Sequence, residues 1–453
     1  MCEEAGVPAS TLCCEGFVGL AKATSIGLGM PTIPVAVVPG HTNVQSTLEL
    51  RSNVLETTLR NVIDNLTTQP EAGVFGDEPE DGAMVFEGSF EAVNDHFVEQ
   101  EWSDGLPIVP PTRARIEAFL AHTDEPPEKV LGVMLPDSRA ATIWSVAVNG
   151  VMAGCRPEYM PVLVALAEAM ADPYYGVEHS GNTPGGETLI IVNGPIVKEL
   201  GLNYTQGVMR DGFRPNTSIG RFWRLYLRNV AGFLLHKNDK ATFGNTWRVV
   251  IAENEDCLTK IGWNTVAEDM GMARGANAVT ISRHTGGNLS VSLSGDVRRD
   301  MLPYLADSVV RQVNWQIMFT VGQGMGTLRP QVLITPILAE TFFKAGITKQ
   351  DLKQYLFDHA RMPAREFERI LRDWTLKPTW DLVQEVRLGT IPKVFAESDD
   401  PNRMVPIVWE PNDYMIAVTG DPMRNSAYVF GHNGILGYPV THEIRLPKGW
   451  KTH

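Results

Sequence analysis

The chain has 453 residues, of which 43% are apolar and 20% are charged, and its formal net charge is −14. This composition is ordinary for a folded globular protein, and the length suits two or three domains of the usual ~100–200 residues. The acidic balance leaves no basic stripe that would displace counterions from phosphates, so it excludes a nucleic-acid partner. Gly and Pro interrupt the apolar stretches before they reach the ~18 residues of a membrane span, so no membrane partner is expected.

The opening of the chain predicts a strand–helix–strand–helix pattern over residues 10–15, 17–28, 34–38 and 42–66. Such a βαβα unit implies parallel strands. Two strands do not make a stable sheet alone, so we expect that the chain begins partway through a domain. The five cysteines are irregularly spaced and include no CxxC pair, which favours a reducing cytoplasm over a disulfide framework.

Residues 67–87 carry six acidic and no basic side chains, which is typical of a linker. The predicted fold is therefore α/β, with a small incomplete doubly wound parallel-sheet domain (1–70), an acidic linker (71–87) and a larger α/β domain (88–453). After the linker, residues 89–101 and 113–122 predict helices. The Pro-rich stretch between those helices predicts a rigid extended path. Trp102, Asp104 and Gly105 are interpreted as a turn, and the alternative is that they line a pocket.

The stretch Ser145–Met170 combines a strong helix pattern with a reactive side chain. Pro157 suits the first position of a helix, which places Cys155 just ahead of a helix N-terminus. The positive end of a helix dipole favours a thiolate, so this pattern predicts a depressed pKa and makes Cys155 the candidate nucleophile. The alternative is a small buried residue in a tight helix contact, because free cysteines are often buried.

Downstream, several predicted strands end in polar, glycine-rich loops, where α/β proteins place chemistry. The strand 188–192 leads to Asn193, and the strand 277–282 leads to a loop that contains His284. His179 and His432 lie in similar polar loops. Each of these histidines is a candidate acid, base or metal ligand, or simply a polar loop residue. Further strands are predicted at residues 331–335, 414–419 and 427–430.

Residues 210–229 predict a helix capped by Thr217 or Asn216, with Arg221, Arg224 and Arg228 on one face. A helix N-terminus with a row of guanidinium groups can bind a carboxylate or phosphate. The candidate substrate-binding residues are Thr217, Arg221 and Arg228, together with Asn193. The alternative is that these arginines pair with the surplus acidic side chains.

These signals predict one shared site. Strand C-terminal ends and helix N-termini lie on the same side of a parallel sheet. Asn193, His284, Cys155 and the start of the 217–229 helix are therefore expected to converge, with an anionic substrate held by Arg221 and a proton moved by His284.

Residues 1–66 contain EEAGVPASTLCCEGFVGLAKATSIGLGMPTIPVAVVPG, which resembles the second strand-helix-strand unit of the UGSC family. The downstream segments AVNGVMAGCRPEYMPV, IVNGP, SIGRFWRLYLRN and PVTHEIRLP resemble an extension beside that domain in longer relatives. The family is related to the substrate-handling B subunits of the glycine, sarcosine and betaine reductases. Its Cys/Sec-Gly-Ser-Cys motif does not occur in this sequence, so the resemblance implies that Met1 follows the motif and leaves Cys155 as the remaining thiol.

The resulting hypothesis is a cytoplasmic enzyme of thiol-dependent chemistry, an oxidoreductase acting on a small anionic substrate. The alternatives are a non-redox lyase or hydrolase that uses Cys155 or the loop histidines, or a non-catalytic subunit of a larger reductase complex. An unpaired sheet edge is usually covered, so a homo-oligomer is expected. The sequence identifies no cofactor and no metal.

Overall fold

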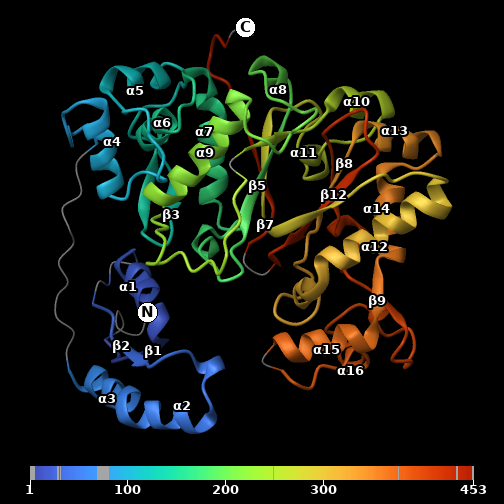
Figure 1. Ribbon diagram of the computed structural model, residues 1–453, viewed down its shortest axis with the longest axis horizontal. Helices are drawn as coiled ribbons and strands as arrows, with labels where there is room; N and C mark the ends of the chain where they lie inside the picture. Colours follow the sequence, from blue (N-terminus) through green and yellow to red (C-terminus); the bar gives the residue numbers. More distant parts are fainter. Residues whose placement is uncertain are drawn as a thin grey trace.

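The structure is a computed structural model, and it describes residues 6–27, 30, 32–68, 81–247, 249–375, 377–434 and 437–450. Figure 1 shows a small N-terminal unit in blue and a larger body in which helices surround a sheet. The predicted α/β class is confirmed, with a parallel strand pair in the small unit and a mixed sheet in the large one. No helix formed by the described residues is long and apolar enough to cross a membrane.

The N-terminal unit has the predicted order of elements. β1 (Thr11–Cys14) pairs in parallel with β2 (Val35–Val38), and α1 (Val18–Gly27) connects them. The helix expected next begins at Thr47 and not at residue 42, because Ser46 and Glu49 form a capping box. It comprises α2 (Thr47–Asn53), a π-helical turn (Val54–Thr58) and α3 (Leu59–Thr67).

Residues 71–80 of the predicted linker lie outside the described residues, and residues 81–88 form neither helix nor strand. A layer of helices follows, and Figure 1 shows it in light blue to green on one side of the sheet. The antiparallel hairpin β3 (Val130–Met134) and β4 (Arg139–Thr142) lies within this part of the chain. The helices of the layer are α4 (Phe90–Glu99), α5 (Arg113–Leu120), α6 (Ile143–Met152), α7 (Met160–Ala171) and α9 (Arg214–Asn229).

The centre of this layer is α7. Pro157 occupies the first position of a short 3-10 turn that leads directly into α7, as the sequence predicts. Nine of the twelve residues of α7 are buried, so this helix is core on nearly every side. It packs between α6 and the sheet, and it belongs to a hydrophobic cluster that also contains α5 and α9.

The large sheet has the strand order β11-β8-β12-β7-β5-β6, and β13 pairs with β7. β5 runs parallel to β6, and β8 runs parallel to β11, but β7 and β12 run antiparallel to their neighbours. The strands are β5 (Glu187–Asn193), β6 (Ile251–Ala252), β7 (Ala278–Ser290), β8 (Gln331–Ile334), β11 (Met415–Val418), β12 (Ala427–His432) and β13 (Val440–Glu443).

The remaining elements complete the second half of the body and its own hydrophobic cluster. The short strands β9 (Arg361–Pro363) and β10 (Met404–Pro406) pair antiparallel. The helices are α8 (Ile196–Glu199), α10 (Glu255–Ile261), α11 (Val266–Asp269), α12 (Leu302–Val313), α13 (Pro336–Lys344), α14 (Lys349–His359), α15 (Ala364–Trp374) and α16 (Leu382–Arg387).

The prediction of a polar loop at residues 283–288 is wrong, because β7 continues through it to Ser290. The glycines there permit close strand pairing. A Cβ atom on Gly287 would lie 2.2 Å from Cε1 of Tyr428 on the neighbouring β12, so only glycine leaves room for that ring. His432 likewise lies in β12 and is buried there, not in a loop.

Gly150 of α6 faces Phe119 of α5 and Leu163 of α7, and its substitution tests the packing of these helices. A Cβ atom at Gly150 would lie 2.6 Å from Leu163 and 2.8 Å from Phe119. We expect Gly150→Ala to lower the free energy of unfolding by about 1 to 2 kcal/mol, since overpacking outweighs the gain in helix propensity. Urea denaturation measures this. Gly16→Ala is the control, because its Cβ atom meets no atom within 4 Å, and an equal loss in both variants would contradict the packing argument.

Candidate ligand-binding cavity

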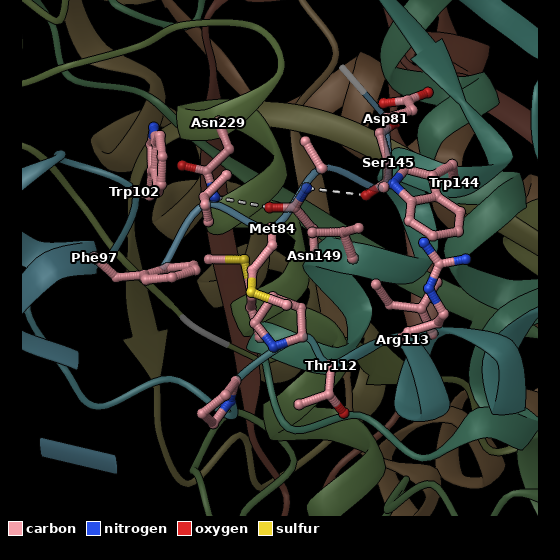
Figure 2. Close-up of a pocket in the computed structure, with 18 of the residues that line it drawn as sticks. Asp81, Met84, Phe97, Trp102, Thr112, Arg113, Trp144, Ser145, Asn149 and Asn229 are labelled. Atoms are coloured by element: carbon pink, nitrogen blue, oxygen red, sulfur yellow. Dashed lines mark hydrogen bonds between the residues drawn. The ribbon is translucent and has the colours of Figure 1, made fainter. Parts of the chain in front are cut away.

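A cavity of about 1170 Å³ lies in the helical layer, between α4, α5, α6 and the segment Asp81–Gly88. Figure 2 shows its lining. Cavities that bind small molecules usually measure ~300–1000 Å³, so this one has room for a small ligand together with ordered water.

One face of α6 forms the main wall of the cavity. Trp144, Ser145, Val148, Asn149 and Met152 all line it. Residues three and four apart share a face of a helix, so this spacing directs all five side chains to the same side. A capping box at the start of α6 fixes where the helix begins and therefore which residues face the cavity.

The side of the cavity near α4 is aromatic and apolar. The rings of Phe97 and Trp102 meet edge to face at 5.4 Å, and Phe86 stacks on His96 at 4.5 Å. Figure 2 shows Met84 in the middle of the cavity, between the Phe97–Trp102 side and the side formed by Trp144. These side chains provide a surface for an aromatic or aliphatic group.

A chain of amide hydrogen bonds crosses the polar wall of the cavity. Asn149 Nδ2 donates to the Ser145 carbonyl at 2.9 Å, and Asn229 Nδ2 donates to Asn149 Oδ1 at 2.8 Å. Because a backbone carbonyl only accepts, it fixes the orientation of both amides. Among the described residues, Asn229 Oδ1 is consequently left buried without a hydrogen-bond partner. Figure 2 shows this oxygen directed toward the Trp102 side, where it is an acceptor for an N–H or O–H donor.

Arginines outnumber carboxylates along the cavity. Arg113, Arg115 and Arg139 line it, together with Asp81 and Glu87. Arg115 donates to the Pro110 carbonyl at 2.9 Å and Arg139 to the Asn229 carbonyl at 2.7 Å, so both are tied to the backbone. Within the described part of the chain, Arg113 makes no hydrogen bond or ion pair, and Figure 2 shows its guanidinium group beside Trp144.

Cys155 lies outside this cavity and in the hydrophobic core. Only 7% of its surface is exposed, and burial raises the pKa of the Cys155 thiol to about 12. The Ser218 hydroxyl and the guanidinium groups of Arg214 and Arg221 act in the opposite direction but do not compensate. The prediction of a depressed pKa is therefore wrong, because desolvation outweighs the helix N-terminus.

The predicted arginine helix does lie beside Cys155, but its arginines are engaged. Its start differs from the prediction, since α9 begins at Arg214 and Thr217 accepts a hydrogen bond from the Gly212 N–H at 3.1 Å. Arg221 donates hydrogen bonds to both carboxylate oxygens of Asp104, at 3.1 and 2.8 Å. Arg228 donates to the Glu101 carbonyl. The alternative interpretation, pairing of the arginines with other groups of the protein, is the one that the structure favours.

The predicted convergence of Asn193 and His284 is wrong. β5 and β7 are antiparallel, with Glu187 opposite His284 and Asn193 opposite Ala278. Residues 278 and 284 are about 20 Å apart at the usual ~3.3 Å per strand residue. The prediction assumed a parallel sheet, in which both strand ends would lie on one edge.

Each of these predicted polar residues has its own local partner. Asn193 Nδ2 donates to the carboxylate of Glu253 at 2.8 Å. His284 is fully buried, its Nε2 lies 2.7 Å from the Ser282 hydroxyl, and burial lowers its pKa to about 3. His179 is exposed, with its ring 3.9 Å from the Glu178 carboxylate. None of the three lines the cavity.

Sequence reasoning missed most of the cavity because its lining comes from five separate segments. A partial signal existed in Trp102, for which a pocket was the alternative to a turn, and in Asn149, an amide inside an otherwise apolar helix. A buried amide in such a helix needs a partner, and its partner Asn229 lies 80 residues away.

Comparison with known proteins covers only the start of the chain. The model of the UGSC family matches residues 1–68, the small N-terminal unit that the sequence already assigned to this resemblance. No curated protein matches the chain, and no solved structure does. The cavity lies in the part of the chain beyond this match.

Alkylation of the cysteines tests the buried setting of Cys155. Because the folded thiol has a pKa of about 12, we expect Cys155 to react more slowly with iodoacetamide at pH 7 to 9 than the half-buried Cys13 and Cys14. The thiol of the unfolded chain ionises near pH 9, whereas the folded thiol ionises near pH 12. The unfolded state therefore loses this proton first, and the free energy of unfolding falls as the pH rises from 9 toward 12. Mass spectrometry measures the rates, with urea-unfolded protein as the control. Fast labelling of Cys155 in the folded protein would contradict this setting.

The Arg221–Asp104 pair fixes the loop before α5, and its geometry predicts a cost for a conservative change. Both side chains are largely buried. Arg221→Lys keeps the charge but loses the two-pronged contact, so we expect it to lower the free energy of unfolding by about 1 to 2 kcal/mol. The matched control is Arg299→Lys, which alters an exposed pair with Asp300 and should cost far less, because solvent screens exposed ion pairs. Equal effects in urea denaturation would contradict the structural role of Arg221.

Proposed function

We propose that this protein binds an amphipathic small molecule in the cavity, one that carries an aromatic or aliphatic body, an N–H or O–H donor and an anionic group. The observation that carries the proposal is the lining itself. An aromatic side, a buried amide oxygen and a guanidinium group face one space, and neither polar group has a partner among the described residues. Sites for small molecules typically combine such an apolar surface with a few placed polar groups.

Each part of the ligand has a counterpart in the lining. The body packs on Phe97 and Trp102, where rings meet edge to face. The donor reaches Asn229 Oδ1, which otherwise stays buried and unsatisfied at a cost of roughly 1–3 kcal/mol. The anionic group meets Arg113 at the opposite end, where a guanidinium group binds a carboxylate, sulfonate or phosphate with two N–H groups.

The proposal keeps the small anionic ligand that the sequence predicts and assigns it to different residues. Cys155 does not take part, since its thiol is buried and protonated. An oxidoreductase function, or a role as a subunit of a reductase complex, is a separate proposal. It rests on the resemblance stated from the sequence, and the UGSC match over residues 1–68 names no activity.

Binding of 1-anilinonaphthalene-8-sulfonate tests the proposal, because this probe has an aromatic body, an N–H donor and a sulfonate. We expect saturable binding with one probe per chain, measured by its fluorescence and by quenching of the tryptophan emission. Val148→Trp fills the cavity from α6 and should abolish binding. Unchanged binding to Val148→Trp, with the fold intact by circular dichroism, would refute the cavity as the site.

The anionic preference has its own control. Arg113→Glu should weaken binding of the sulfonate probe by about three- to tenfold, yet change binding of the uncharged N-phenyl-1-naphthylamine less than about twofold. Arg210→Glu makes the same charge change on an exposed arginine outside the cavity and should affect neither probe. Equal losses in the two arginine variants would show that only the net charge matters.

A further inference from the structure

Residues 82–88 form the irregular wall of the cavity, and their apolar side chains are only partly packed. All of these residues line the cavity, and none belongs to a helix or a strand. Met84 is 80% exposed, and Val85 and Phe86 are 40% and 39% exposed. Figure 2 shows Met84 in the middle of the cavity. Three consecutive apolar side chains therefore border an open space, as apolar residues do where a protein contacts another molecule.

This segment is held weakly to the rest of the protein. Among the described residues, the backbone and side chains of residues 83–88 form no hydrogen bond or ion pair. The Pro-rich segment before α5 also lines the cavity, but its Ile108 N–H donates to Asn94 Oδ1 at 2.6 Å. Phe86 provides a ring contact, since it stacks on His96 of α4 at 4.5 Å. Segments with few hydrogen bonds and few buried contacts open at a small cost in free energy.

A glycine stands at each end of the segment. Gly82 has a φ of +82°, in the left-handed region that residues with a side chain disfavour. At Gly88, a Cβ atom would lie 2.9 Å from Cε1 of Phe86, so glycine leaves room for this ring to fold back onto α4. Helix α4 follows directly, because Ser89 caps it. Residues 83–87 are thus a short strap between two pivots, and small residues at the ends of such a strap are typical hinges.

We propose that residues 82–88 are a gate, which opens to admit the ligand of the cavity and closes on it by rotation about Gly82 and Gly88. This inference rests on the proposed binding function and adds how the ligand enters and leaves. In the closed state, Met84 and Val85 pack on the apolar body of the ligand, which removes their surface from water. The flexible thioether of Met84 adapts to the shape of that body. The ligand itself therefore favours closure, because it makes contacts with the gate that the open state lacks.

The first pivot lies beside the proposed contact for the anionic group. A Cβ atom on Gly82 would lie 3.6 Å from Nη2 of Arg113, so a ligand anion on this guanidinium group is close to the hinge. The opposite wall is fixed, since Gly150 packs α6 against α5 and α7, and Asn229 donates to Asn149 at 2.8 Å. Closure of the cavity thus occurs by movement of the gate against a rigid helix.

Stopped-flow binding of 1-anilinonaphthalene-8-sulfonate to the full chain tests the gate. Because the gate must move during binding, we expect the observed association rate to reach a plateau as the probe concentration rises, on the order of 1000 s⁻¹ for a millisecond motion. Saturable binding at equilibrium with an association rate that rises linearly to the limit of the instrument would overturn the gate alone. Absence of saturable binding would overturn the proposed function together with the gate.

Release of the Phe86 contact provides matched variants. Phe86→Ser removes the stacking on His96, so we expect both the association plateau and the dissociation rate of the probe to rise by about three- to tenfold. Phe243→Ser is the control and should change neither rate, because Phe243 is 98% exposed and lies outside the cavity. A rise in the dissociation rate alone would show that Phe86 is a fixed contact of the probe, and it would overturn the gate.

A disulfide at the second pivot tests the movement directly. Cβ atoms at positions 88 and 92 would lie 3.3 Å apart, close to the ~3.5–4.5 Å found in disulfides. In the double variant Gly88→Cys and Ala92→Cys, oxidation should lower the association plateau at least about fivefold, because it fixes the hinge. Reduction with dithiothreitol should restore the rate, so the reduced form is the control in the same molecule. Equal rates in the two forms, with the disulfide verified by mass spectrometry, would contradict a moving gate.

Discussion

The antiparallel pairing of β5 with β7 is the constraint on which the large body depends. It runs from Glu187 opposite His284 to Asn193 opposite Ala278, and it buries both strands in the centre of the sheet. Because the strands carry charged side chains into this interior, other elements must supply their partners. Arg224 from α9 reaches the Glu187 carboxylate at 3.4 Å, and burial nevertheless raises the pKa of that carboxyl group. The buried Glu187 carboxylate of β5 needs a charged partner, and Arg224 provides it, so this ion pair holds α9 against the sheet.

The same pairing orders the loop before β5. Arg283 on β7 donates to the Gly176 carbonyl at 3.1 Å and to the Ser180 hydroxyl at 3.0 Å, and its guanidinium group lies over the Tyr175 ring. A buried guanidinium group needs several acceptors in fixed positions, so it determines the path of this loop. His284 and His432, which the sequence places in loops, therefore belong to the packing of the sheet, whereas His179 stays exposed in a turn.

The cavity lies between helices that are fixed by contacts on either side of it, while no described side chain fills the space between them. Arg221 fixes the loop before α5 through Asp104, and Gly150 brings α6 against α7 and α5. The opposite face of α6 is left to Asp81–Gly88, a segment without regular structure. One wall of the cavity is therefore the helix α6, with the hydrogen-bonded amides of Asn149 and Asn229, and the other is the irregular segment Asp81–Gly88. Binding sites often combine a rigid element with such a loop.

The sequence by itself determined the local elements, because their signals lie within a few residues. The βαβα order of the N-terminal unit, the helix after Pro157 and the strand that ends at Asn193 were all predicted from periodicity and capping residues. The 42–66 helix was predicted in the same way, although only the structure shows that its leucines Leu55 and Leu59 are exposed.

Strand direction and burial were decided by the tertiary structure. Nothing in residues 277–288 distinguishes a glycine-rich loop from a strand that needs glycine to admit Tyr428, since the ring comes from a segment 141 residues away from Gly287. The state of Cys155 depends on desolvation by helices that the local helix-start signal does not include. Asn149 and Asn229 meet only when α6 and α9 pack. Contacts between distant segments set strand order, solvation and hydrogen-bond partners, and a local pattern contains none of these.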